Sequence, residues 1–408
     1  MQSCLILSIH KIQLYQNLST IVHATILQPI STKGEVVVVV VDSLTTIGSR
    51  QRPPMSENHN HHSKSSVITK INASYFRICI SAGTQALLWK TVSEHYSHNS
   101  PSPSLIFRTI FKAGYFVLWC LTLFTLMILS LVYALKCVFH FRIVKAEFRH
   151  HVGINYLFAP WISWLLLLQS APVFVFRNER TYECIWWLLI VPLVVLDVKV
   201  YGQWFTTEKR FLSIMANPTI QMSVIGNLVG SHAAIKAGQT EICICLFTFG
   251  MTHYLVVFIT LYQRLSGGNH IPADLRPVFF LFVATPSMAT LAWKSINGSF
   301  DIVCKMFFFL SMFLFVSLAS RPVLFKKSVK RFSVEWWAFS FPLTFLALAS
   351  IAYAQQVKDV AAEILALVLS VTSVLVFFSL LVCSILKIHS LVHKPILCFS
   401  TGLGSTNV

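Results

Sequence analysis

The chain has 408 residues, of which 55% are hydrophobic and only 12% are charged, and its mean hydropathy is +0.68. This composition excludes an ordinary soluble domain and indicates a protein that crosses a membrane several times. The formal net charge of +17 does not indicate nucleic-acid binding, because the cations cluster at the ends of apolar segments, where they fix membrane orientation.

The two ends of the chain are predicted to be tails. Residues 1–70 are polar and aperiodic, as in SENHNHHSKSSV, and we expect a cytoplasmic N-terminal tail there. Met55 is a candidate natural start, which would leave residues 1–54 outside the native protein. Residues 387–408 are predicted to form a cytoplasmic C-terminal tail.

Between the tails, residues 71–386 form one predicted transmembrane domain with ten apolar segments. Each segment is close to the roughly 20 residues that a bilayer-spanning helix needs. The ten predicted spans are approximately 72–92, 114–136, 152–171, 184–203, 213–234, 241–262, 277–294, 302–324, 334–353 and 361–386.

The odd-numbered spans differ from the even-numbered ones. Even spans are bulky and apolar around their whole circumference, whereas odd spans are rich in small and hydroxyl residues and contain an internal proline, about eight or nine residues from the inner end. The first span has small residues at the corresponding depth instead. We therefore predict five two-helix repeats, each with a kinked inner helix and a straighter outer helix. The residues at the predicted kinks are Ser81, Gly83, Pro160, Pro218, Pro286 and Pro342.

These interruptions suggest a pore. A proline removes one backbone donor and leaves a carbonyl without its helical partner, and a bilayer tolerates such irregular backbone only around a solvated cavity. The N–H groups at the start of each outer half-helix favour an anion weakly over a cation. Phe341, directly before Pro342, and Phe158, two residues before Pro160, could close such a pore. The alternative is that the kinks shape helix packing and that both rings are packing residues.

Charge in the loops predicts the orientation. The connections that follow even spans are rich in Lys and Arg, while those that follow odd spans mix fewer cations with acids. By the positive-inside rule both termini are cytoplasmic. Arg77, a few residues into the first span, is expected to extend its side chain to the inner membrane interface.

Enzymatic and metal-binding classes are not supported. The ten cysteines include no CxxC pair, so neither a disulfide framework nor a zinc site is predicted. His140, His150 and His151 form a histidine cluster of the kind seen in membrane di-iron enzymes, but no second cluster follows. We expect no catalysis, no metal and no cofactor.

Several long runs resemble one known family. KAEFRHHVGINYLFAPWISWLLLLQSAP, KRFLSIMANPTIQMSVIGNLVG and RFSVEWWAFSFPLTFLALAS are similar to the plant slow-type anion channels, within the tellurite-resistance and dicarboxylate transporter superfamily. The resemblance extends from about residue 70 to residue 386. The short tail is most similar to the short-tailed homologues of the guard-cell channel.

The resemblance implies an all-α membrane protein in which ten transmembrane helices form five hairpins around a quasi-fivefold central pore. It implies a trimer of the same chain or of related subunits, located in the plasma membrane, that passes chloride and nitrate. In the family a phenylalanine directly before the proline of the ninth helix closes the pore, and Phe341 matches it. Regulatory kinases that phosphorylate long tails open some members, but the tail here is short.

Two other functions remain open at this point. The chain could be a secondary transporter of small organic anions such as malate, as other branches of the superfamily are. It could also be a silent subunit that modulates partners in a mixed trimer. A large ohmic current would favour the channel, a saturable flux the transporter, and a current only on co-expression the modulatory subunit.

Overall fold

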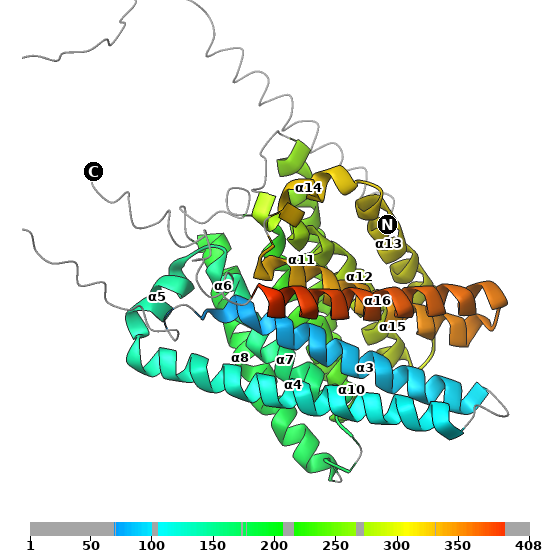
Figure 1. Cartoon of the computed structure of the whole chain (residues 1–408). Helices are drawn as coiled ribbons and strands as arrows, with labels where there is room; N and C mark the ends of the chain where they lie inside the picture. Colours follow the sequence, from blue (N-terminus) through cyan, green and yellow to red (C-terminus); the bar gives the residue numbers. More distant parts are fainter. Residues whose placement is uncertain are drawn as a thin grey trace, which may run out of the picture. The chain divides into compact units, whose positions relative to one another are not determined.

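The computed structural model describes residues 69, 71–99, 105–172, 174–176, 178–206, 216–266, 273–330 and 332–387. Nearly all of the predicted N-terminal tail, the C-terminal tail beyond residue 387, and the start of the fifth predicted span lie outside these residues. Every regular element in the described ranges is helical (Figure 1).

Five helices occupy the odd-numbered predicted spans, and each follows a short helical turn. Such a turn orients the chain before the longer helix begins, and its presence in all five places is a structural repeat. The five pairs are η1 (Ala73–Tyr75) with α3 (Phe76–Asn99), α6 (Gly153–Tyr156) with α7 (Phe158–Ser170), η3 (Pro218–Ile220) with α10 (Gln221–Lys236), η4 (Ala273–Phe280) with α12 (Leu281–Asn297), and η5 (Val334–Trp336) with α15 (Trp337–Val357).

Five further helices occupy the even-numbered spans, and each packs against the odd helix before it in the chain. They are α4 (Leu105–Phe139), α8 (Glu179–Thr206), α11 (Thr240–Ser266), α13 (Ile302–Ala319) and α16 (Val360–Leu386). Two short helices, α5 (Phe141–Arg149) and α14 (Pro322–Lys330), lead from α4 and α13 toward the next odd helix. The five predicted hairpins are therefore present.

The odd helices form a closed ring. Helix α3 contacts α7, α7 contacts α10, α10 contacts α12, α12 contacts α15, and α15 contacts α3 again. The first and last hairpins are consequently neighbours, and Figure 1 shows α16 beside α3. This ring confirms the predicted arrangement of five hairpins around one axis.

Burial separates the inner helices from the outer ones. In the most apolar part of Val334–Val357, 89% of the residues are buried, compared with 22% in Thr109–Phe139 and 17% in Ile302–Ala319. The outer helices present large apolar side chains, among them Phe124, Leu188 and Phe313, to the surroundings. An apolar surface of this extent suits contact with lipid.

The number of membrane spans is less than ten if each helix is judged alone. Seven described helices are long and apolar enough to cross a membrane, and an eighth is counted if Phe141–Arg149 and Gly153–Ser170, which meet at 108°, form one span. Helix α10 has only 16 residues, and α3 includes Arg77, Lys90 and Glu94. Helices occupy all ten predicted ranges, but the count of ten spans stays a prediction.

The prolines of the odd helices do not share one register. Counted from the start of the preceding turn, Pro160 is the eighth residue and Pro342 the ninth, as expected. Pro286 is the fourteenth, because η4 lengthens this helix by a 3₁₀ segment of eight residues, and Pro218 is the first residue of η3. These counts are taken from the helix starts and do not measure depth in a membrane, so a common depth of the prolines stays a prediction.

Gly83 lies at a contact between helices. A Cβ atom at this position would lie 3.4 Å from the Leu166 Cβ and 3.8 Å from the Thr122 Cγ2. These are ordinary van der Waals distances, so α3 meets α7 and α4 at Gly83 and alanine would also fit there. Its predicted role at a kink that lines the pore is not tested by these contacts.

Asp301 caps α13 and attaches it to α12. Its carboxylate accepts hydrogen bonds from the Cys304 backbone N–H at 3.0 Å, the Trp293 Nε1–H at 3.0 Å and the Asn297 Nδ2 group at 3.2 Å. Slight burial acts to raise the pKa of Asp301, but these hydrogen bonds outweigh it and hold the pKa below its usual range. A carboxylate with a lowered pKa contributes stability above its unfolded-state pKa of about 3.9, and this contribution is lost as the pH falls through the folded-state value.

We therefore expect Asp301→Asn to lower the free energy of unfolding by about 1 kcal/mol at neutral pH, and to have less effect as the pH falls below about 4. Thermal unfolding of the purified protein in detergent between pH 3 and pH 7 measures this. Asp359 is the matched control, because it precedes α16 and its side chain makes no capping hydrogen bond. Equal losses of unfolding free energy in Asp301→Asn and Asp359→Asn would contradict the assignment of Asp301 as the residue that caps α13.

Candidate functional site: a basic vestibule within the helix ring

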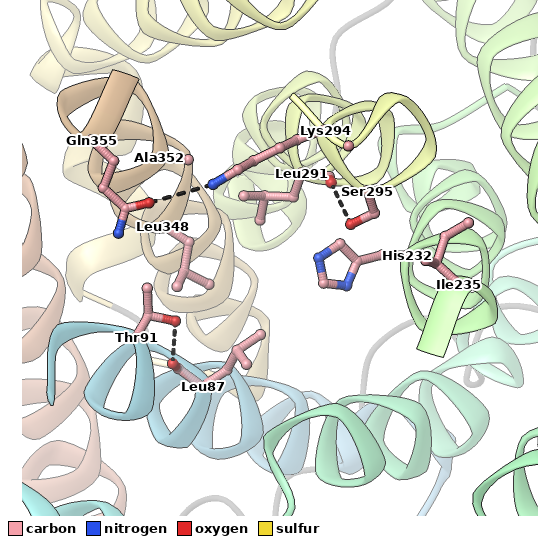
Figure 2. A pocket seen from close by; sticks show the side chains of 11 residues that line it. Leu87, Thr91, His232, Ile235, Leu291, Lys294, Ser295, Leu348, Ala352 and Gln355 are labelled. Atoms are coloured by element: carbon pink, nitrogen blue, oxygen red, sulfur yellow. Dashed lines mark hydrogen bonds between the residues drawn. The ribbon is translucent and has the colours of Figure 1, made fainter. Parts of the chain in front are cut away.

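A cavity of about 340 Å³ lies inside the helix ring, near the C-terminal ends of the odd helices. We call it the vestibule. Side chains from α3, α10, α12 and α15 surround it in Figure 2. Its lining residues are Leu87, Thr91, His232, Ile235, Leu291, Lys294, Ser295, Gly298, Leu348, Ala352 and Gln355.

The polar groups of the vestibule come from different helices. Lys294 extends from α12 toward α15, where its Nζ donates to Gln355 Oε1 at 3.4 Å (Figure 2). The Thr91 and Ser295 hydroxyls donate to carbonyls of their own helices, Leu87 at 3.0 Å and Leu291 at 3.1 Å. These hydroxyl oxygens still have acceptor capacity, whereas the Lys294 ammonium retains two further donors.

The remaining inner helix, α7, contacts the vestibule residue His232. Gln169, on α7, donates its Nε2 group to the Val229 carbonyl at 2.9 Å, so its Oε1 is an acceptor. The His232 Nδ1 lies 3.0 Å from that Oε1 and must therefore be the donor. A neutral His232 ring consequently has its proton on Nδ1 and a lone pair on Nε2.

The vestibule is electropositive. None of its lining residues is acidic, and Lys294 is close enough to His232 to act on it electrostatically. Two more lysines lie at the same ends of the inner helices: Lys90 Nζ donates to the Ala171 carbonyl at 3.2 Å, and Lys236 Nζ lies 4.9 Å from the centre of a tyrosine ring. The C-terminal parts of four inner helices line this cavity, and their dipoles would disfavour an anion, so these cations offset that field.

Phe341 lies on the face of α15 that continues from the vestibule. Leu348, Ala352 and Gln355 line the cavity, and Phe341 and Phe345 each lie seven residues before one of the first two. Seven residues are nearly two turns, so these side chains share one face, with Phe341 about 10 Å along the axis from Leu348. Phe341 is fully buried, and its ring centre lies 6.2 Å from that of Phe345 in an edge-to-face arrangement.

Other predicted pore residues make contacts between helices. The Ser81 Oγ donates to the Trp337 carbonyl at 3.3 Å, which joins α3 to α15. Phe158 is fully buried in the first turn of α7, next to Pro160. None of these contacts tests whether the residues line a pore, so that role stays a prediction for them.

Sequence reasoning missed the vestibule residues themselves. His232, Lys294 and Gln355 are spread over more than 120 positions, and no local motif joins them. One signal was available: Lys90, Lys236 and Lys294 each lie in or near the last turns of an odd-numbered span, where apolar residues would be expected. Cations at equivalent ends of three inner helices predict a basic pore mouth.

At the other end of the ring, three odd repeats meet in a buried ion pair. The Arg77 Nη1 lies 2.6 Å from Glu335 Oε2, and the Tyr156 hydroxyl donates to the same oxygen at 2.7 Å. Arg77 also lies over the Tyr156 ring, 4.5 Å from its centre, and is fully buried. The expectation that Arg77 reaches the membrane interface is therefore wrong, because Glu335 satisfies its charge inside the protein.

The ring of helices, its basic mouth and its apolar outer surface define a multi-span membrane protein that conducts or transports anions. Residues 70–385 match the family described as voltage-dependent anion channel. The chain belongs to this family.

Named relatives agree with this membership. The S-type anion channel SLAH1 of Arabidopsis thaliana is 53% identical over 337 residues, which are 82% of this chain and 86% of that protein. The S-type anion channel SLAH4 of the same plant is 52% identical, over 83% of this chain and 89% of that protein. The guard cell S-type anion channel SLAC1 is 38% identical over 78% of this chain and 55% of that longer protein.

Proposed function

We propose that this chain is a plasma-membrane channel that passes chloride or nitrate along the axis of the helix ring, with Phe341 closing the pathway. The observation that carries the proposal is the continuous face of α15. It lines the basic vestibule with Leu348, Ala352 and Gln355 and continues to the buried Phe341 ring. An anion drawn into the vestibule by its cations would meet an apolar constriction about two turns further along the axis.

Loop charge gives the proposed orientation. Arg142, Lys145 and Arg149 are on α5, and α14 has three lysines, and both helices lead to the N-terminal ends of odd helices. The positive-inside rule therefore places these ends in the cytoplasm and the vestibule on the outer side. The names of the relatives support anions as the permeating species, and we propose a trimer, of this chain alone or with related subunits, as the assembly.

Two-electrode recording from oocytes that express the chain tests the function. We expect an ohmic current whose reversal potential follows the chloride or nitrate gradient when either anion is exchanged for gluconate. Cation replacement should leave the reversal potential unchanged. A saturable, proton-coupled flux without ohmic current would contradict the channel and favour a transporter, and a current that requires co-expression would favour a modulatory subunit.

A further inference from the structure

We propose that Lys294 and His232 together form an anion-binding site in the vestibule, and that protonation of His232 at Nε2 strengthens it. The site rests on the proposed function and extends it, because it identifies where an anion binds before the Phe341 constriction and what controls the occupancy of that site. Lys294 comes from α12 and His232 from α10, and both extend to the same cavity in Figure 2. Each is held by a neutral amide on a third or fourth helix.

Lys294 supplies the permanent charge. Its contact with Gln355 Oε1, at 3.4 Å, is long for a hydrogen bond and uses one of three ammonium donors. Gln355 is neutral, so the ammonium has no carboxylate partner among the residues that line the vestibule. A cation held without an acid in a mostly apolar cavity attracts an anion more strongly than it would in bulk water.

His232 supplies the variable charge. Because Nδ1 donates to Gln169, a proton can be added only at Nε2, where it converts a lone pair into a second charged donor. Lys294 on α12 is the charged group that acts on the ring, and Gln169 is its neutral partner on α7. Lys90 on α3 interacts electrostatically with Lys236 and with Glu94 on its own helix. Burial of the ring and the Lys294 charge oppose the added proton, and a bound anion offsets them. Proton and anion binding therefore favour each other.

The cavity size indicates how the anion is held. A water molecule occupies about 30 Å³ of the liquid, so a cavity of about 340 Å³ admits a chloride or nitrate ion together with several waters. The ion can thus exchange part of its hydration shell for the Lys294 and His232 donors without losing all of it. Binding of this kind is weak enough to release the ion, as conduction requires.

Binding can be measured without any current. Thermal unfolding of the purified chain in detergent is followed as sodium nitrate replaces sodium gluconate at constant ionic strength, at pH 4.5 and at pH 8. We expect nitrate to stabilise the protein at both pH values, with an apparent Kd at least about threefold lower at pH 4.5. His232→Gln should remove the pH difference, and Lys294→Gln should raise the Kd by about tenfold or more, since a charge-assisted hydrogen bond is lost.

Two matched variants and one rescue keep the test interpretable. His253→Gln and Lys305→Gln are the controls, because these residues lie on α11 and α13 and do not line the vestibule. Both should behave as the unmodified chain. Lys294→Arg retains the charge and should retain nitrate stabilisation even if Lys294→Gln folds poorly. Nitrate stabilisation that is unchanged in both His232→Gln and Lys294→Gln would overturn the proposal.

Recordings of the nitrate current distinguish a failure of this binding site from a failure of the proposed channel function. If the proposed function holds, external acidification from pH 7.5 to pH 4.5 should change the nitrate current of the unmodified chain and leave that of His232→Gln unchanged. An anion current with no such difference would overturn the site and leave the channel standing. Nitrate stabilisation that depends on both residues, in a chain without current, would support the site and contradict the channel.

Discussion

Replacing Phe341 by alanine is expected to increase the constitutive anion conductance about tenfold or more. The ring is fully buried on the face of α15 that continues from the vestibule. In the proposed pathway its removal would open an apolar constriction that an anion can cross only by losing water. Lowering that barrier by about 1.4 kcal/mol is sufficient for a tenfold rise. Two-electrode recording in chloride and in nitrate measures the conductance, normalised to the amount of protein at the cell surface.

The neighbouring aromatic residue Phe339 provides the matched control. Its ring packs against Phe280 on η4 with a centre-to-centre distance of 4.4 Å, so it belongs to a contact between helices. Phe339→Ala removes the same volume from the same helical turn and should leave the conductance per surface channel unchanged. Phe341→Leu should give an intermediate conductance. Unchanged conductance in Phe341→Ala, with normal surface expression, would remove Phe341 from the gate.

Hydropathy and composition predicted the arrangement of the helices but not the short helical turns that begin the inner helices. Spans rich in small and hydroxyl residues became the inner ring, because small side chains let helices approach and because hydroxyl groups bond to helix carbonyls within the ring, as Ser81 does. The same pattern could not show that η4 lengthens its helix by a 3₁₀ segment, since a 3₁₀ turn and an α-helical turn of apolar residues have similar composition.

The sequence likewise did not predict side-chain partners that lie far apart in the chain. An arginine near the end of a span is read as interfacial because its charge is costly in lipid, yet Glu335 lies 258 residues away in the chain and accepts it at 2.6 Å. The vestibule is similar, because its polar residues come from four helices. The Arg77–Glu335 pair depends on the ring closure between the first and last hairpins, and the vestibule depends on contacts between successive inner helices. No local pattern encodes either arrangement.

Breaking the Arg77–Glu335 pair should produce the largest loss of stability. In Arg77→Met the Glu335 carboxylate, whose side chain is 5% exposed, loses its cationic partner and keeps the hydrogen bond from the Tyr156 hydroxyl at 2.7 Å. A buried charge that loses its partner costs about 3 to 5 kcal/mol. We expect Arg77→Met to lower the unfolding temperature in detergent much more than Glu179→Gln does. Glu179, an exposed acid at the start of α8, serves as the control.

The paired variant decides whether the loss comes from charge or from packing. In Arg77→Met with Glu335→Leu both charges are absent and apolar volume remains, so most of the lost stability should return. The coupling between the two positions should then be about 2 kcal/mol or more, as expected for groups in direct contact. If the stability loss of the double variant equals the sum of the two single losses, each residue instead acts through separate neighbours. Because the pair joins the first, second and fifth repeats at one end of the ring, a strong coupling would show that this charge pair helps to close the ring around its axis.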